Sequence, residues 1–400
     1  MKDKNYLILF GLVWFVVASF ITIHFMVFYK LYELPFGRND VDNYIGTTYK
    51  WITGEKYNIS HMLFMVAGAA AYNFGVRPEL LFSILMPVAL GLIPVAAFMF
   101  YVYMTKSAKI AFVSFVFMVF GTFSMFSFWI MSLWGQAIST ALLMLALVFY
   151  DLAVVSDKRY YIAFGVAVIF AMLAHYISPF MIILFLLLKF IDEKKTIDAL
   201  SIGVVLFIGL IVMVFFMEND RFSSSYPVVL GPVYIFDNAA MILVWFLSIY
   251  GMIASRKDAK LRVLSWFTII GIIASSQFVL WRPIVTILCF VAMFAGIGLI
   301  KILGRLSKVY VILVYIMVAV LLLNYSYAQY AGFMNMMLWE MIDNSPDPPR
   351  SIDPQPFRGL FFSGNEIQVM GYITQFSNST HERSRIVDNG TVGPVLITGM

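Results

Sequence analysis

Residues 34–61 read LPFGRNDVDNYIGTTYKWITGEKYNISH and form one of the few long polar stretches in this chain of 400 residues. The rest is largely apolar: 62% of all residues are hydrophobic and only 12% are charged, about half the charge of a soluble domain. The stretch places Asp40 and Asp42 just after the first hydrophobic segment and follows them with an aromatic-rich run. The position of this stretch relative to a membrane therefore decides the topology of the whole chain.

Long apolar runs separated by short polar loops are typical of an all-α polytopic membrane protein. The first run follows Lys2 and Lys4 and is too long for the core of a signal peptide, so we expect a retained helix. The sequence predicts about eleven transmembrane helices, at residues 6–32, 80–104, 109–127, 136–155, 160–175, 178–191, 199–217, 238–254, 262–276, 284–300 and 309–328. The sixth is short for a transmembrane helix, since a helix needs about 20 residues to cross a bilayer.

A further apolar segment, 62–74, decides which loops share a side. As a helix it would cover only ~20 Å, which suits a helix lying in the membrane interface. With this segment on the surface and the N-terminus inside, the cytoplasmic loops after residue 80 hold fourteen Lys and Arg residues. Between residues 80 and 328 the outer side holds two, Arg221 and Arg282. The positive-inside rule favours this arrangement, so we expect a plasma-membrane protein with the 34–61 stretch and the C-terminal tail outside.

The chain divides into two regions. Residues 1–328 form the transmembrane domain, whose first outer loop (33–79) carries two interfacial helices, at 43–53 and 62–74. Residues 329–400 hold six of the fourteen prolines and predict a small extracytoplasmic α/β tail, with one helix and two strands around an Asn-Gly turn. Seventy-two residues make a marginal domain, so this tail is a small domain or a truncated one.

The acidic pair in the first outer loop is the main candidate for chemistry. In an extended segment Asp40 and Asp42 would face the same way, and such oxygen ligands suit Mg²⁺ or Mn²⁺. Alternatively, one of them could act as a general base that accepts a proton from an attacking hydroxyl. The structural alternative for Asp42 is that it caps a helix running over 43–53. Asp40 has no such alternative and is the stronger catalytic candidate.

Basic side chains on the outer side are candidates for binding substrate. Arg282, beside Trp281, could hold a phosphate by bidentate hydrogen bonds or could be an interfacial anchor. Arg221 lies in an acidic and polar loop, where solvation is the simpler interpretation. His175 ends the fifth predicted span and His61 begins the second surface helix. Each could face substrate or make a local structural hydrogen bond.

The outer segment WIMSLWGQ (129–136) contains Trp134 and Gln136, a polar-aromatic pair of the kind that stacks on sugars, although aromatic belts look the same. Other sites have no support in the sequence. It lacks the spacings of a zinc site, a serine nucleophile and a Walker loop, and Cys289 is the single cysteine. The net charge of +5 comes from short loops between apolar runs and does not indicate nucleic-acid binding.

The order of these features resembles the GT-C class of membrane glycosyltransferases, which includes oligosaccharyltransferases, protein mannosyltransferases and aminoarabinose transferases. The resemblance rests on the acidic motif Asp40-Val-Asp42-Asn-Tyr44 after the first span, the two surface helices, Trp134-Gly135-Gln136 and the element 174–179. It covers about residues 1–330. The Trp-Trp-Asp-Tyr-Gly motif of oligosaccharyltransferases is absent.

This resemblance implies transfer of a sugar from a polyprenyl phosphate or diphosphate to an acceptor on the outer face. It implies that Asp40 or Asp42 is the base or metal ligand and that Arg282 holds the lipid phosphate. Two other hypotheses stay open: a transporter or flippase of lipid-linked sugars, and a non-catalytic subunit with the same fold. Transport would favour charged or broken helices at mid-membrane depth, and the predicted spans contain almost no charged residues.

Overall fold

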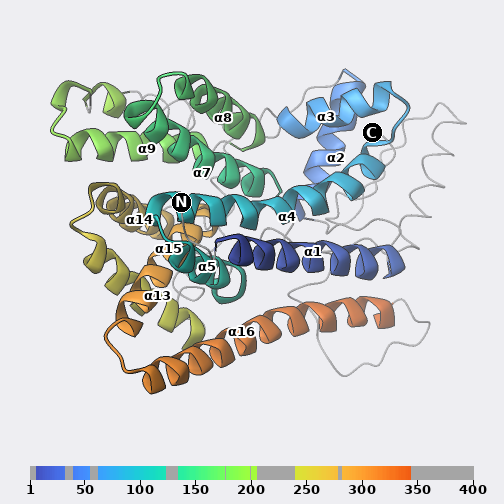
Figure 1. Ribbon diagram of the computed structural model, residues 1–400. Coiled ribbons are helices and arrows are strands. Elements are labelled where there is room, and N and C mark those ends of the chain that lie inside the picture. The colour runs from blue at the N-terminus through green and yellow to red at the C-terminus, as the bar shows by residue number, and fades with distance from the viewer. Residues whose placement is uncertain are drawn as a thin grey trace, which may run out of the picture.

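The protein is a bundle of helices in the computed structural model (Figure 1), which describes residues 6–31, 39–54, 62–122, 134–175, 177–198, 200–204, 239–277 and 282–343. These residues contain no strand. The helices are α1 (Tyr6–Leu31), α2 (Asn39–Ile52), α3 (Met62–Asn73), α4 (Pro78–Thr105), α5 (Ala108–Val116), the π-helix η2 (Phe117–Gly121), α7 (Trp134–Val155), α8 (Tyr160–Ala174), α9 (Ile177–Asp192), α13 (Ala239–Ser255), α14 (Ala259–Gln277), α15 (Arg282–Leu303) and α16 (Lys308–Asp343).

Helix α15 is the centre of the bundle. Almost every described side chain from Ile284 to Leu303 is buried, and α5, α13 and α14 all pack against it. The hydroxyl of Ser114 on α5 donates to the carbonyl of Met293 on α15 at 3.1 Å. An apolar helix without a polar face suits this position, because it has neighbours on all sides.

Two glycines set the close crossing of α13 and α15. A Cβ atom on Gly251 would lie 2.0 Å from the carbonyl oxygen of Phe294, and one on Gly298 would lie 2.0 Å from that of Leu247. Small residues let two helix backbones approach this closely, as is common inside membranes. The crossing therefore depends on the absence of a side chain at both positions.

The two short helices α2 and α3 lie together at one end of the bundle, at the upper right of Figure 1. We call this the α2–α3 end. The turn 256–258 between α13 and α14 lies at the other end, which we call the α13–α14 end. Helix α2 packs on α3 through Tyr44 and Phe64, whose ring centroids are 4.4 Å apart, and Phe64 in turn contacts Phe82 of α4.

The start of α2 differs from the prediction. The helix begins at Asn39, so Asp40 and Asp42 lie in its first turn. Asp42 therefore does not cap a helix beginning at residue 43. The prediction that Asp40 and Asp42 lie in an extended segment is also wrong, because the backbone there is helical. Asn39 is itself a residue type that helices favour at their beginning, which explains why the helix can start four residues earlier.

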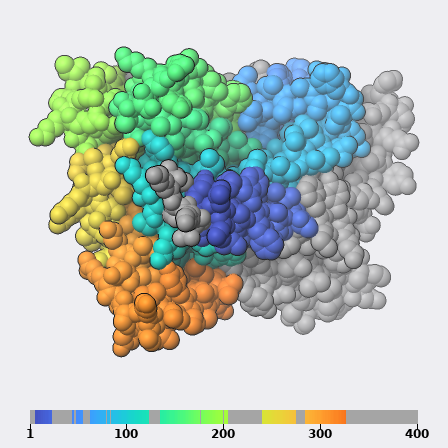
Figure 2. Space-filling view, viewed as in Figure 1, coloured from blue at the N-terminus to red at the C-terminus, as the bar shows by residue number. Residues whose placement is uncertain are grey.

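The fold is that of an all-α membrane protein. Four helical segments are long and apolar enough to cross a membrane, within Leu80–Thr105, Trp134–Val155, Ile284–Leu303 and Lys308–Tyr325, and five described helices are shorter and apolar. Large apolar side chains face outward on the outer helices, for example Leu7, Phe15, Ile162 and Val309. Figure 2 shows α1 on the surface between the α7–α9 segment and the α15–α16 segment. Such a surface suits lipid as the solvent.

Most predicted spans match a helix to within a few residues, and the last one is longer than predicted. Helix α16 continues to Asp343 instead of ending at residue 328, so residues 329–343 are helix and not the start of a loose tail. The helix stops just before the proline-rich run that begins at Pro346, as expected since proline cannot continue a helix. The predicted α/β fold of residues 344–400 and most of the predicted span 199–217 lie outside the described residues.

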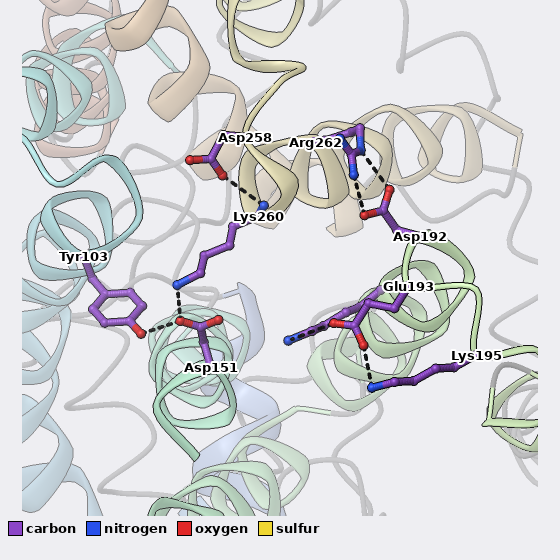
Figure 3. Close-up of polar contacts among 9 residues, drawn as sticks. Tyr103, Asp151, Asp192, Glu193, Lys195, Asp258, Lys260 and Arg262 are labelled. Atoms are coloured by element: carbon purple, nitrogen blue, oxygen red, sulfur yellow. Dashed lines mark hydrogen bonds and ion pairs between the residues drawn. The ribbon is translucent and has the colours of Figure 1, made fainter. Parts of the chain in front are cut away.

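Two ion pairs and a hydrogen bond join four helices near the α13–α14 end (Figure 3). Asp151 of α7 is buried and lies 2.5 Å from the Nζ atom of Lys260 on α14. The hydroxyl of Tyr103 on α4 donates to the same carboxylate oxygen. Arg262 of α14 donates two hydrogen bonds of 2.8 Å to Asp192 at the end of α9. Helices α4, α7, α9 and α14 are thus held together by charge at this end.

Candidate active site at the α2–α3 end

Tyr44 fixes the acidic helix α2 to the beginning of α7. Its side chain is fully buried, and its ring stacks on Trp134 with centroids 5.7 Å apart and planes at 15°. The backbone N–H of Gly135 donates to the Tyr44 hydroxyl oxygen at 3.0 Å. This N–H belongs to the first turn of α7, where helices have no carbonyl partner of their own. Tyr44 therefore acts as a cap for α7 as well as a packing residue.

A second contact fixes the beginning of α7 to the beginning of α15. The side-chain amide of Gln136 donates to the hydroxyl of Thr286 at 3.1 Å. Thr140, one turn further along α7, shares a hydrogen bond of 2.8 Å with the same hydroxyl. All three side chains are almost completely buried. A buried amide N–H and two buried hydroxyls that bind one another favour one arrangement of the two helices.

His175 closes the turn between α8 and α9. It follows the last residue of α8, and its Nδ1 atom accepts the backbone N–H of Ile177 at the start of α9 at 3.3 Å. Its carbonyl oxygen accepts the hydroxyl of Ser139 on α7 at 3.1 Å. The imidazole is 1% exposed. The prediction that His175 ends its helix is confirmed, and its observed contacts are those of a residue that shapes the turn.

Two predicted binding residues, Trp134 and Gln136, are buried between helices. We predicted that Trp134 and Gln136 form a face on which a sugar could stack. Both side chains are buried, because Tyr44 covers the indole and Thr286 binds the amide. In this structure they hold helices together and do not present that face.

The predicted charged residues are described in part. Asp40 and Asp42 lie in the first turn of α2, and Arg282 is the first residue of α15; their side chains lie outside the described part of the structure. His61 and Arg221 lie outside it altogether, so their substrate-binding roles stay predictions. Asp42 is two residues from Tyr44, and Arg282 is four residues, or one helical turn, from Thr286. The contacts of Tyr44 and Thr286 with α7 thus tie both helix beginnings to the same turn of α7.

Four residues of this network were not predicted from the sequence: Tyr44 as a hydrogen-bonding residue, Ser139, Thr140 and Thr286. The signal that could have found them is a polar side chain inside an apolar run, which a membrane helix rarely carries without a partner. The spacing helps too, since Thr140 follows Gln136 by four residues and lies on the same helix face.

The predicted Mg²⁺ or Mn²⁺ site is a separate question. Among the side chains that the structure describes, no three His, Cys, Asp or Glu residues gather into a metal site. The two carboxylates that could hold such an ion, those of Asp40 and Asp42, are not among these side chains, so the cation stays a prediction.

Comparison with known proteins gives a match at the level of the fold. No family model and no curated protein sequence matches the chain. The structure is similar to the apo crystal structure of an oligosaccharyltransferase from Archaeoglobus fulgidus, with a TM-score of 0.54 and 11% identity. The chain has a GT-C-like fold. The match covers 91% of this chain and 62% of that one, so the chain spans less than two thirds of the length of the protein that it matches.

Proposed function

We propose that the protein is a membrane glycosyltransferase that moves a sugar from a polyprenyl phosphate or diphosphate to an acceptor on the outer face of the membrane. The GT-C-like fold supports this class. The residues that we propose for the chemistry are Asp40 and Asp42 in the first turn of α2 and Arg282 at the start of α15. The ligands are a lipid-linked sugar and a hydroxyl-bearing or amide-bearing acceptor.

The observation that carries the proposal is the chain of contacts that joins α2 to α15 through the first turn of α7. Tyr44 binds Gly135, and the next residue, Gln136, binds Thr286. These are rigid, buried contacts on helices, which hold a site more precisely than loops do. A transferase needs this kind of link, because its base and its phosphate-binding cation must keep a constant separation around the reacting sugar.

The proposed reaction uses the three charged residues in distinct roles. One carboxylate of the acidic pair accepts the proton of the acceptor as the acceptor attacks the anomeric carbon of the sugar. The bond from that carbon to the phosphate oxygen breaks, and the guanidinium of Arg282 stabilises the phosphate that leaves. Because residues i and i+2 of a helix do not face each other, a Mg²⁺ or Mn²⁺ ion would be held by one carboxylate of the pair, Asp40 or Asp42, where it would add positive charge near the leaving phosphate.

The first experiment tests the acidic residue. Purified protein is incubated with a radiolabelled polyprenyl-phosphate sugar, with and without chelator. The labelled sugar that is released by hydrolysis or linked to an acceptor is then counted. We expect the wild-type protein to release labelled product and Asp40→Asn to lose at least about 100-fold in rate, as expected for a general base. The control is Asp157→Asn, in the turn between α7 and α8. Full turnover by Asp40→Asn would overturn the assignment.

The second experiment tests the cation. Arg282→Ala should raise the KM for the lipid donor by about tenfold or more, because a charge-assisted bidentate contact is lost, with little change in the KM for the acceptor. If the wild-type protein binds lipid-linked sugar but never transfers it, the non-catalytic alternative holds. If it moves the intact donor between leaflets of a vesicle, the flippase alternative holds.

A further inference from the structure

Charged residues are divided unevenly across the α13–α14 end. On the side formed by α7, α8 and α9, five basic residues accompany five acidic ones, and Lys260 and Arg262 reach across from α14 to two of these carboxylates. The other side is formed by the turns α4–α5, α13–α14 and α15–α16. It carries one acidic residue, Asp258, and seven basic ones, which we call the cationic face: Lys106, Lys109, Arg256, Lys257, Lys301, Arg305 and Lys308.

The balanced side uses its charges to bind itself. Besides the Lys260–Asp151 and Arg262–Asp192 pairs, Lys195 lies 2.7 Å from Glu193 and Arg159 lies 2.7 Å from Asp157. Figure 3 shows the first three of these pairs: two of them join α14 to α7 and to α9, and the third, Lys195–Glu193, lies in the turn after α9. Little positive charge is left over on this side for a partner.

The cationic face has no such internal partners. All seven side chains are exposed, and none of them makes an ion pair with any side chain that the structure describes. Asp258 caps α14 by accepting the backbone N–H groups of Lys260 and Leu261. Arg305 lies over the ring of Tyr250, 5.9 Å from its centroid, which leaves its charge uncompensated. Seven positive charges in one area repel each other and favour an anionic partner.

Helix packing brings the three turns together. Lys109 and Lys301 each lie five to eight residues beyond the contact between Ser114 of α5 and Met293 of α15, about 8–12 Å along either helix. Arg256 follows Gly251, which crosses Gly298 on α15, by five residues. The three turns therefore end at a similar depth around the end of the buried helix α15.

We propose that the cationic face binds the phosphate groups of anionic phospholipids in the leaflet next to it. Two of the turns directly follow helical segments long and apolar enough to cross a membrane, within α4 and α15, and the third follows the shorter apolar helix α13. Long side chains at such helix ends reach the headgroup level. Beside them, Val309, Tyr310 and Ile312 at the start of α16 are exposed and apolar, which suits contact with acyl chains. Basic residues at this position attract anionic lipid. This inference does not depend on the proposed sugar transfer.

The test compares two sets of four substitutions that remove the same charge. The first replaces Lys109, Lys257, Lys301 and Lys308 on the cationic face by Gln. The matched control replaces Lys158, Arg159, Lys194 and Lys195 on the balanced side by Gln. A third variant replaces the first four lysines by Arg. Each protein is reconstituted into vesicles of phosphatidylcholine and phosphatidylglycerol, and the relative association of spin-labelled lipids is measured by electron spin resonance.

We expect the wild-type protein to prefer phosphatidylglycerol and the first variant to lose about fivefold or more of that preference. The control and the arginine variant keep the preference for phosphatidylglycerol. Salt at 1 M removes this preference, because the attraction between charges is then screened within about 3 Å. Equal loss in the control, or an unchanged preference in the first variant, overturns the proposal. If inorganic phosphate displaces the lipid better than chloride does at equal ionic strength, the ligand is free phosphate and the lipid assignment is wrong. Circular dichroism and melting of the glutamine and arginine variants separate charge loss from misfolding.

Discussion

Helix α7 carries a buried polar network at each end, and the two differ in charge. At the α2–α3 end, Gln136 and Thr140 bind Thr286 through neutral groups. Near the α13–α14 end, Asp151 binds Lys260 and Tyr103. Gln136 and Asp151 are fifteen residues apart, or about 22 Å along the helix. The same helix is thus fixed by uncharged hydrogen bonds at one end and by an ion pair at the other.

The difference shows where each end of the molecule uses its charges. Near the α13–α14 end, carboxylates and cations are used to hold helices together. At the α2–α3 end, among the side chains that the structure describes, helices are held by hydroxyls, an amide and aromatic rings. In the proposed function, Asp40, Asp42 and Arg282 act on the substrate while these neutral groups hold the helices that carry them.

The largest expected effect comes from breaking the charged network. Asp151→Ala leaves the ammonium of Lys260 without its partner in a half-buried place, and we expect it to lower the free energy of unfolding by about 3 kcal/mol. The measurement is unfolding of the purified protein by SDS in mixed micelles. Asp157→Ala is the control, because Asp157 pairs only with its exposed neighbour Arg159, and it should cost below about 1 kcal/mol. Equal losses would show that burial of the Asp151 pair has no special importance.

Breaking the neutral network should cost less. Thr286→Val keeps the shape of the side chain but removes the partner of Gln136 and Thr140, and we expect a loss of about 1–2 kcal/mol in the same assay. Thr268→Val is a matched control, since Thr268 is equally buried but bonds only to the carbonyl of Leu264 in its own helix. A cost no greater than that of the control would mean that the contact between α7 and α15 contributes nothing to stability.

The smallest effect, and the one that depends on pH, concerns Arg262 and Asp192. Hydrogen bonds from Arg262 hold the pKa of the Asp192 carboxyl below its usual value. A lowered folded-state pKa means that the stabilisation is present above the unfolded pKa of about 3.9 and is lost on further acidification. Arg262→Gln should therefore cost below about 1 kcal/mol at pH 7, because the pair is partly exposed, and the cost should shrink as the pH falls below about 3.9. A difference that grows on acidification would contradict this pairing.

The sequence predicts the helices well because the signal for a membrane helix is local. A run of about 20 apolar residues must be a helix in lipid, where each backbone group needs a partner within its own segment. The ends of α4, α7, α8 and α15 accordingly fall within a few residues of their predicted bounds. Helices α2 and α16 differ most: α2 begins at Asn39 instead of residue 43, and α16 ends at Asp343 instead of residue 328.

Composition and spacing along the chain predict the helices, the polar stretch at 34–61 and the charged candidates. They do so because each segment in lipid must be apolar and must satisfy its own backbone hydrogen bonds. The partners of those segments do not follow from composition and spacing. Tyr44 meets Gly135 across 91 residues, and Lys260 meets Asp151 across 109. Contacts of this kind depend on how the helices turn about their own axes when they pack, and many pairings satisfy the same pattern of apolar runs. Only the packed bundle selects one of them, and with it the burial of Trp134 and Gln136 as parts of the scaffold.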